Sequence, residues 1–227
     1  MANIHLNKGF LGVIMELEKK KYFDEEEFRR FFAAIDSLRP ATPQKKRDKK
    51  ADQLLFRLVL NYGLRTTEAV RLKLEDINEL EKQIYIRRLK RKGNPGRWYD
   101  LPNDIMKLYQ DWKKTRDKIP EAGRNPFLFV SQMSLNGQRR GPAEHLSHDQ
   151  LYRRFKKYLG LAGLPMTFHP HALRHSCGVI LAAKGYSAFD IQRRLGHASL
   201  SSTLCYVDLK GKEELERNKA MSEALKI

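Results

Sequence analysis

The sequence predicts a mostly α-helical protein with one small antiparallel β-sheet, and three observations support this fold class. Apolar residues recur at helical spacing in several stretches, and capping residues or glycines mark their ends. Residues 83–102 instead alternate around a Gly-Asn-Pro-Gly turn, which is typical of a β-hairpin. The chain of 227 residues has no internal repeat, and its length suits one large domain or one domain with a small appendage.

Helices fill most of the first half. Residues 22–38 place three phenylalanines and an isoleucine at helical spacing behind an acidic first turn. Residues 39–50 are polar and contain prolines, so we expect a loop there, followed by a helix over residues 51–65. Gly63 is suited to end that helix, and Thr66 can cap the short helix after it.

The second half continues the helical pattern after the hairpin. Pro102 opens a helix, and a long loop over residues 119–147 precedes a strongly basic helix over residues 148–164, capped by a serine. Further helices are predicted over residues 171–185, 187–196 and 199–209. The last residues form a tail whose apolar positions require a partner surface.

The charge of the chain indicates a polyanionic partner. Lys and Arg number 44 against 27 Asp and Glu, a formal net charge of +17, which points to nucleic acid more than to an anionic membrane. No apolar run is long enough to span a membrane, and the N-terminus lacks a signal-peptide pattern, so we expect a cytoplasmic protein. Cys177 and Cys205 form no CxxC pair and are expected to be packing residues.

Two helix starts carry candidate anion-binding residues. Arg65 lies in the turn between two helices, where a helix N-terminus favours anions, and Glu68 is close enough to brace its guanidinium. His171 and Arg174 are spaced to share one face of a helix that begins near Pro170. In isolation, each of these residues could equally be a capping or solvated side chain.

The remaining histidines of this segment are interpreted as structural. His175 points to a different side of the helical wheel, and His169 precedes the helix.

The hairpin and the C-terminal region add further candidates. His197 follows a helix-ending glycine, and Tyr206 lies nine residues later on the next short helix. Lys90 and Lys92 flank the hairpin tip, from which a lysine can reach a site formed elsewhere. Arginines bind phosphate oxygens, histidine and lysine move protons, and tyrosine can be a covalent nucleophile. The sequence contains no acidic cluster that would predict a metal site, and we expect no cofactor. These candidate residues therefore suit attack on a phosphodiester without a metal ion.

The order of these residues resembles the tyrosine recombinases, the phage integrase family. Three segments carry the resemblance, namely GLRTTEAVRL, HALRH and LGHASLSSTLCY, in matching order and spacing. The resemblance covers residues 22–206 and implies the catalytic-domain fold of that family. Residues 1–21 then form a short N-terminal extension, and residues 207–227 form a tail helix that either docks on a neighbouring subunit or remains solvated.

The resemblance implies site-specific DNA recombination, whether integration, excision or inversion, through a 3′-phosphotyrosine intermediate without metal or ATP. Bond energy is kept in the covalent intermediate, and the released 5′-hydroxyl of a partner duplex attacks it in turn. By the family pattern, Arg65 and Arg174 clamp the scissile phosphate, Glu68 supports Arg65, His171 and His197 assist the phosphate and the proton transfers, and Tyr206 attacks.

The general acid is the least determined of the implied residues. The family hairpin pattern aligns with KGNPGRWYDL at Lys92, and Lys90 stays an alternative because tip lengths vary. Asp100 stands where the family often has proline. Only about twenty residues precede the catalytic region, whereas the family commonly carries an N-terminal DNA-binding domain there. We therefore expect either a protein similar to the short recombinases that invert fimbrial promoters or a trimmed part of a longer chain.

The resemblance also implies the partners: double-stranded DNA with inverted-repeat half-sites, a homodimer on each site and a homotetramer at synapsis, with no membrane. The residues expected to contact DNA are Arg153, Arg154, Lys156, Lys157, Arg193 and Arg194.

Two rival functions remain open. One is a non-catalytic DNA-binding regulator with a helix-turn-helix-like C-terminal region. The other is a type IB topoisomerase-like enzyme that nicks and reseals one duplex.

Overall fold

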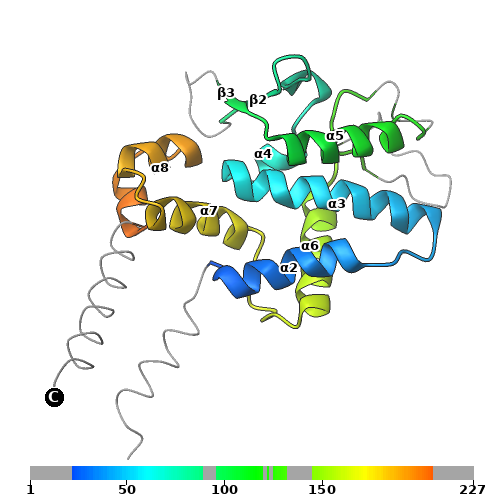
Figure 1. Cartoon of the computed structure of the whole chain (residues 1–227), viewed down its shortest axis with the longest axis horizontal. Helices are drawn as coiled ribbons and strands as arrows, with labels where there is room; N and C mark the ends of the chain where they lie inside the picture. The colour runs from blue at the N-terminus through cyan, green and yellow to red at the C-terminus, as the bar shows by residue number, and fades with distance from the viewer. Residues whose placement is uncertain (1–21, 89–95, 120–121, 123–124, 132–144, 207–227) are drawn as a thin grey trace, which may run out of the picture.

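The computed structural model of the chain describes residues 22–88, 96–119, 122, 125–131 and 145–206. A long helix, α3 (Pro43–Tyr62), runs through the centre of this part (Figure 1). Helices α2 (Glu25–Ser37), α5 (Asn103–Arg116) and α7 (His171–Ala183) pack against α3, and α6 (His148–Ala162) packs on α2. The predicted fold class, mostly α with a small antiparallel sheet, is confirmed.

Local sequence signals explain most helix ends. The Asp24 side chain accepts a hydrogen bond from the Glu27 amide at the start of α2, and Ser147 caps α6 in the same way through the Gln150 amide. Gly63 ends α3 with a left-handed conformation, φ 55°, as the sequence predicts.

Two predicted helix starts are wrong. Residues 43–50 of the expected loop over residues 39–50 belong to α3, because Thr42 caps the helix and Pro43 occupies its first turn. The charged residues that follow Pro43 are good helix formers on the solvent side, so they extend the helix before its apolar stripe begins. Thr66 likewise is the first residue of α4 (Thr66–Val70), and Arg65 holds the N-cap position.

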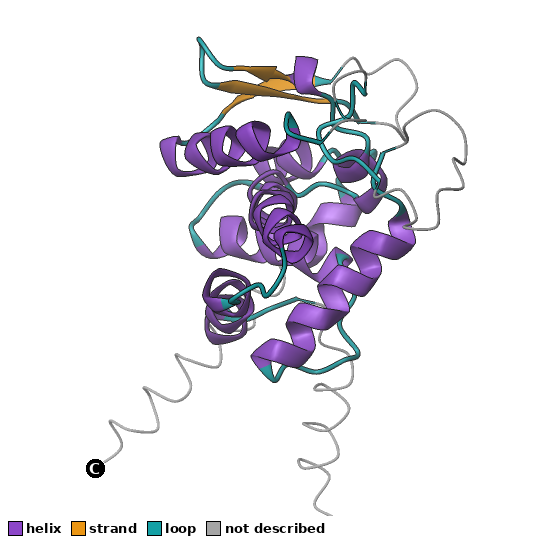
Figure 2. Cartoon of the chain, turned by 90° about the vertical axis from the view of Figure 1, so that its right-hand side faces the viewer, coloured by secondary structure: helices purple, strands orange, loops and turns teal. Residues whose placement is uncertain are grey.

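The sheet lies at one edge of the helical body (Figure 2). It has three antiparallel strands in the order β1 (Ile77–Asn78), β2 (Gln83–Ile86) and β3 (Arg97–Asp100), preceded by the short 3₁₀ helix η1 (Leu74–Asp76). The β2–β3 pairing confirms the predicted hairpin, whereas the two residues of β1 are too few to show an alternating pattern. Lys90 and Lys92 belong to the hairpin tip, residues 89–95, which lies outside the described residues.

The C-terminal part forms a small layer beside α3. Helix α8 (Ala188–Leu195) begins at Ser187, whose hydroxyl accepts from the Asp190 amide, and ends at Gly196 with φ 65°. Residues 201–206 are helical and end the described part of the chain. Predictions for residues 1–21 and for the tail, 207–227, fall outside it.

Two apolar clusters hold these layers together. The main core joins α2, α3, α5, α6 and the inner face of the sheet. A smaller cluster between α7, α8 and the C-terminal residues contains Cys177, Ala182, Ile191, Leu195 and Tyr206. Cys177 is therefore a packing residue as predicted, whereas Cys205 is exposed.

In the part of the chain that the structure describes, no helix combines the length and the apolarity that crossing a bilayer requires.

Candidate active site

The turn between α3 and α4 presents Arg65 beside a buried carboxylate. Glu68, one turn into α4, accepts hydrogen bonds from the Arg65 backbone amide at 2.9 Å and from Arg65 Nη1 at 2.8 Å. The Glu68 side chain is 1% exposed and that of Arg65 is 17% exposed. Glu68 thus fixes the guanidinium of Arg65 at the positive N-terminal end of α4, in the relation that the sequence predicts.

Arg88, at the end of the hairpin's first strand, is a second partner of Glu68 that sequence reasoning missed. Its Nη1 donates to Glu68 Oε2 at 2.9 Å, and its Nη2 donates to the carbonyl oxygens of Tyr62, at 3.1 Å, and of Arg194. One buried guanidinium therefore ties the ends of α3 and α8 to α4. The signal was present, because Arg88 continues the buried alternation of Ile84 and Ile86.

Arg174 lies on α7 and is 4% exposed. Its Nη1 donates to the carbonyl oxygen of Gly63, two residues before Arg65. Burial, then repulsion from the charge of Arg65, lowers the pKa of Arg174 to about 10, so the guanidinium remains charged at neutral pH. The structure thus brings Arg65 and Arg174 together around the end of α3.

His171 is the exposed first residue of α7, one turn before Arg174. Its place at the N-terminus of the helix is the one that the sequence predicts. An imidazole there can reach an anion bound by Arg174 from the solvent side.

His197 follows the left-handed Gly196, whose carbonyl oxygen accepts from Arg65 Nη2 at 3.2 Å. Its Nδ1 lies 2.9 Å from the hydroxyl oxygen of the buried Thr203. Burial and then the nearby charges of Arg174 and Arg65 lower the pKa of His197 to about 4, so the ring is neutral at physiological pH. If Nδ1 accepts from Thr203, Nε2 carries the proton and can donate to a phosphoryl oxygen.

Tyr206 is 3% exposed and packs its ring on α7. The ring of His197 stacks on it with centroids 6.2 Å apart and planes at 16°. The ring passes so close to Gly178 that a Cβ there would come within 2.9 Å of its Cζ. Burial raises the pKa of the Tyr206 phenol to about 12, against the lowering effect of Arg174. The hydroxyl is thus protonated in the resting protein and must lose its proton to act as a nucleophile.

His175 was interpreted as structural from its position on the wheel, and the structure gives it a different place. Its Nδ1 lies 2.8 Å from the Tyr206 hydroxyl oxygen, and the two rings are 6.0 Å apart between centroids. The wheel argument was itself wrong, because His175 lies four residues after His171 and the two side chains therefore share a side of α7. Tyr206 approaches α7 from the side of Gly178, one turn after His175.

The guanidiniums of Arg65, Arg88 and Arg174 meet the single carboxylate of Glu68 in this site, which leaves an excess of positive charge. This charge lies next to the buried phenol of Tyr206 and the imidazoles of His175 and His197. Such an arrangement can bind a phosphate group and stabilise the negative charge that develops on its oxygens during attack. Among the described residues, no group of three or more His, Cys, Asp or Glu side chains could hold a metal ion.

We expect Glu68→Gln to lower the free energy of unfolding by about 3 kcal/mol, because it leaves two closely held guanidiniums without a counter-charge. Urea denaturation measures this. Asp36→Asn, which breaks the more exposed ion pair with Arg57, is the matched control and should cost at most about 1 kcal/mol. Equal losses for the two variants would contradict a structural role for the buried carboxylate.

The basic residues of α6 do not all face solvent. The Arg154 guanidinium, which the sequence predicts to contact DNA, donates to the buried Asp52 at 2.9 Å and to Asp48 at 3.3 Å. Lys156 Nζ is likewise engaged by the carbonyl oxygens of Met166 and Phe168. Arg153 and Lys157 are exposed.

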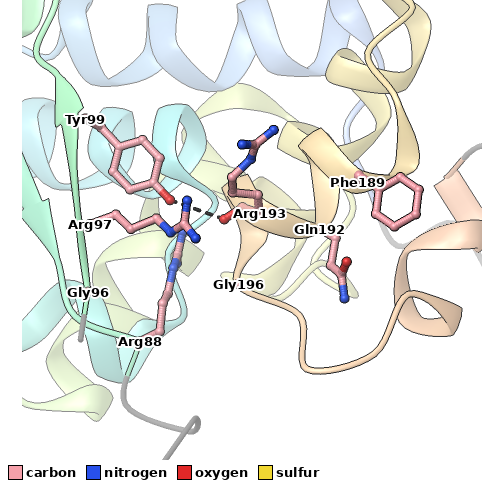
Figure 3. Close-up of a pocket in the computed structure, with 8 residues that line it drawn as sticks. All are labelled: Arg88, Gly96, Arg97, Tyr99, Phe189, Gln192, Arg193 and Gly196. Carbon is pink, nitrogen blue, oxygen red and sulfur yellow. Dashed lines mark hydrogen bonds between the residues drawn. The ribbon is translucent and has the colours of Figure 1, made fainter. Parts of the chain in front are cut away.

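The two arginines near the end of α8 also differ. The guanidinium of Arg194 lies over the rings of Tyr62 and Tyr99, at 5.3 and 5.1 Å from their centroids. Arg193 is exposed and borders a pocket of about 340 Å³ between α8 and β3 (Figure 3). The pocket is lined by Arg88, Gly96, Arg97, Tyr99, Phe189, Gln192, Arg193 and Gly196.

Comparison with known proteins finds the family that the sequence resembles. The family profile described as "Phage integrase family" matches residues 21–213. The chain is 35% identical over 145 residues to the type 1 fimbriae regulatory protein FimB of Escherichia coli (strain K12), covering 64% of this chain and 66% of that protein. It is 32% identical over 200 residues to the tyrosine recombinase XerA of Pyrococcus furiosus, covering 87% of this chain and 61% of that protein.

Solved structures show the same fold. A post-cleavage complex of the XerH site-specific recombinase with a palindromic difH substrate superposes with a TM-score of 0.71 at 26% identity, covering 90% of this chain and 54% of that one. The catalytic domain of bacteriophage HP1 integrase superposes with a TM-score of 0.53 at 16% identity, covering 84% of this chain and 88% of that one. The chain spans about half to two thirds of the length of FimB, XerA and the XerH chain.

Proposed function

The chain belongs to the phage integrase family, and we propose that it is a site-specific DNA recombinase whose Tyr206 cleaves and rejoins DNA strands through a 3′-phosphotyrosine intermediate. The single observation that carries the proposal is the clustering of Arg65 and Arg174 beside His197, whose ring stacks on the buried ring of Tyr206. Those side chains come from three separate segments, and fold maintenance alone does not require two neighbouring guanidiniums of like charge.

In the proposed cleavage step, Tyr206 Oη attacks the scissile phosphorus and the bond to the 5′-oxygen breaks. Arg65 and Arg174 bind the non-bridging oxygens, where negative charge develops, and the neutral His197 donates a further hydrogen bond. The 5′-hydroxyl of the partner strand then reverses the step on the phosphotyrosine. Because each step exchanges one phosphate ester for another, the reaction needs no external energy source.

Lys92 is proposed as the general acid that protonates the departing 5′-oxygen. We expect Lys92→Ala to slow single-turnover cleavage by about 10²- to 10⁴-fold. Lys90→Ala, the neighbouring lysine of the same hairpin, is the control and should change the rate by less than about fivefold. A reversed ranking would assign the acid to Lys90.

A substrate with sulfur in place of the bridging 5′-oxygen sharpens this test, because a thiolate leaves without a proton. It should restore the Lys92→Ala rate to nearly that of the unmodified protein. A persistent defect on the sulfur substrate would contradict a role in leaving-group protonation.

The proposed DNA surface follows the exposed cations. Arg153 and Lys157 on α6, and Arg97 and Arg193 beside the pocket, can contact backbone phosphates. The proposed partner is double-stranded DNA with inverted-repeat half-sites, bound by a homodimer and brought together in a homotetramer. The tail, residues 207–227, is proposed to dock on the neighbouring subunit, and the protein is proposed to act in the cytoplasm.

A nicked duplex carrying candidate inverted repeats tests the proposed function. Loss of a short fragment after cleavage removes the 5′-hydroxyl that would reverse the reaction, so a protein–DNA adduct should accumulate and resist denaturing electrophoresis, with EDTA present and ATP absent. Binding without an adduct would favour the non-catalytic regulator. Relaxation of supercoiled DNA that lacks any specific site would favour the topoisomerase-like alternative.

A further inference from the structure

We propose that His175 is a catalytic residue, the general base that takes the proton of the Tyr206 hydroxyl as it attacks; this inference rests on the proposed function. Among the predicted residues, His171 lies at the exposed start of α7, whereas the Tyr206 hydroxyl is within hydrogen-bond distance of His175. Arg65 and Arg174 are cationic, and Lys92 is assigned to the leaving oxygen.

The position of His175 meets the first requirement of a base, which is direct reach to the proton. Its Nδ1 lies 2.8 Å from Tyr206 Oη, which is hydrogen-bond distance. His175 is half-buried on α7, one turn before Gly178, against which the Tyr206 ring packs. The missing side chain at position 178 therefore lets the phenol lie close to the helix, within reach of the imidazole.

The other imidazole beside Tyr206 is less suited to the role. The nearest hydrogen-bond partner of His197 Nδ1 is the hydroxyl of Thr203, and the ring of His197 stacks on that of Tyr206. A stacked ring presents its face, and a proton acceptor must present a nitrogen lone pair in its plane. His175 makes the contact with the phenolic oxygen through a ring nitrogen.

The need for a base follows from the burial of the nucleophile. Burial raises the pKa of Tyr206 to about 12, so almost no phenolate exists at neutral pH. Attack therefore requires that the proton leave as the bond to phosphorus forms.

The proposed step balances as follows. The Tyr206 Oη–P bond forms, the P–O5′ bond breaks, the phenolic proton moves to His175 Nδ1, and the departing 5′-oxygen receives a proton from the general acid. The step requires His175 to begin with its ring proton on Nε2, so that Nδ1 presents a lone pair to the phenol. When the 5′-hydroxyl attacks the phosphotyrosine, its proton returns to the general acid and His175 returns its proton to Tyr206, which completes the cycle.

Three substitutions at this position separate a base from a residue that only positions the tyrosine. Asn places an amide group near the position of Nδ1 and can keep the hydrogen bond, but it cannot take up a proton at neutral pH. We expect His175→Asn, His175→Gln and His175→Ala each to slow adduct formation by about 10²- to 10⁴-fold, with DNA affinity within threefold of the unmodified protein. His148→Asn, at the exposed start of α6, is the matched control and should cleave normally.

Two further arms make the assignment specific. Added imidazole should accelerate His175→Ala, which leaves space beside Tyr206, and should not accelerate His175→Asn. The bridging-sulfur substrate should leave the defects of the His175 variants in place, whereas it removes that of Lys92→Ala. Thermal melting and DNA binding of each variant confirm that the variant is folded.

Cleavage by His175→Asn within threefold of the unmodified rate would overturn the proposal, since a hydrogen bond without basicity would then suffice. Rescue of the His175 variants by sulfur would overturn it too, because their defect would then concern the leaving group. Failure of the proposed function looks different: the unmodified protein itself would form no adduct on the nicked duplex.

Discussion

Tyr206→Phe abolishes the covalent adduct on a nicked duplex while leaving DNA binding within about threefold of the unmodified protein: this is the largest effect that we expect. The substitution removes only the nucleophilic oxygen. The phenyl ring keeps its packing on Gly178 and its stacking with His197. The lost hydrogen bond to His175 costs about 0.5–1.5 kcal/mol, which a folded domain tolerates.

Denaturing electrophoresis of the trapped complex and a binding titration on the intact site measure the two quantities. Tyr186→Phe, on an exposed tyrosine before α8, is the matched control and should form the adduct at the normal rate. An adduct formed by the Phe variant at position 206 would remove this residue from the role of nucleophile.

Arg174→Lys gives the second-largest expected effect, a loss of about 10²- to 10³-fold in the rate of adduct formation. Lysine keeps the positive charge but lacks the planar fork with which arginine can bond the Gly63 carbonyl oxygen and a phosphoryl oxygen together. Because the charge remains, the affinity for DNA and its salt dependence should change little.

Single-turnover cleavage and salt titrations of binding check this pair of expectations. Arg71→Lys, at the exposed end of α4, is the control and should leave the cleavage rate unchanged. A rate loss matched by an equal loss of affinity would show that Arg174 holds the DNA in the ground state and contributes nothing specific to the transition state.

The elements with strong local signals were predictable from the sequence. Helix caps at Ser147 and Ser187 and the left-handed glycines at 63 and 196 each produce their structure within a few residues, so the sequence alone places them. The start of α3 was placed too late because its first turns are charged and solvent-exposed, and an apolar pattern cannot reveal a helix face that touches no core.

The candidate site was predictable where residues adjacent in sequence act together. Glu68 braces Arg65 within one helical turn, and the spacing alone suggests this. Arg88 was missed because its role depends on contacts with three segments distant in sequence, although the buried face of its strand was visible in the alternation.

The contact between His175 and Tyr206 was not predicted for a related reason. The side of α7 on which Tyr206 packs depends on the path of the residues after α8. Tertiary contacts determine that path, and the local sequence pattern does not show them. The surroundings of the basic residues could not be predicted either, since composition cannot distinguish an exposed arginine such as Arg153 from Arg154, which pairs with a buried aspartate.

Mass spectrometry of the trapped adduct after digestion with trypsin and nuclease tests the central claim most directly. Trypsin releases residues 195–210 as one peptide, in which Tyr206 is the only tyrosine. We predict that this peptide carries the nucleotide remnant, joined through a 3′-phosphate to the phenolic oxygen. A remnant on any other residue, or an unmodified 195–210 peptide in a fully trapped sample, would contradict it.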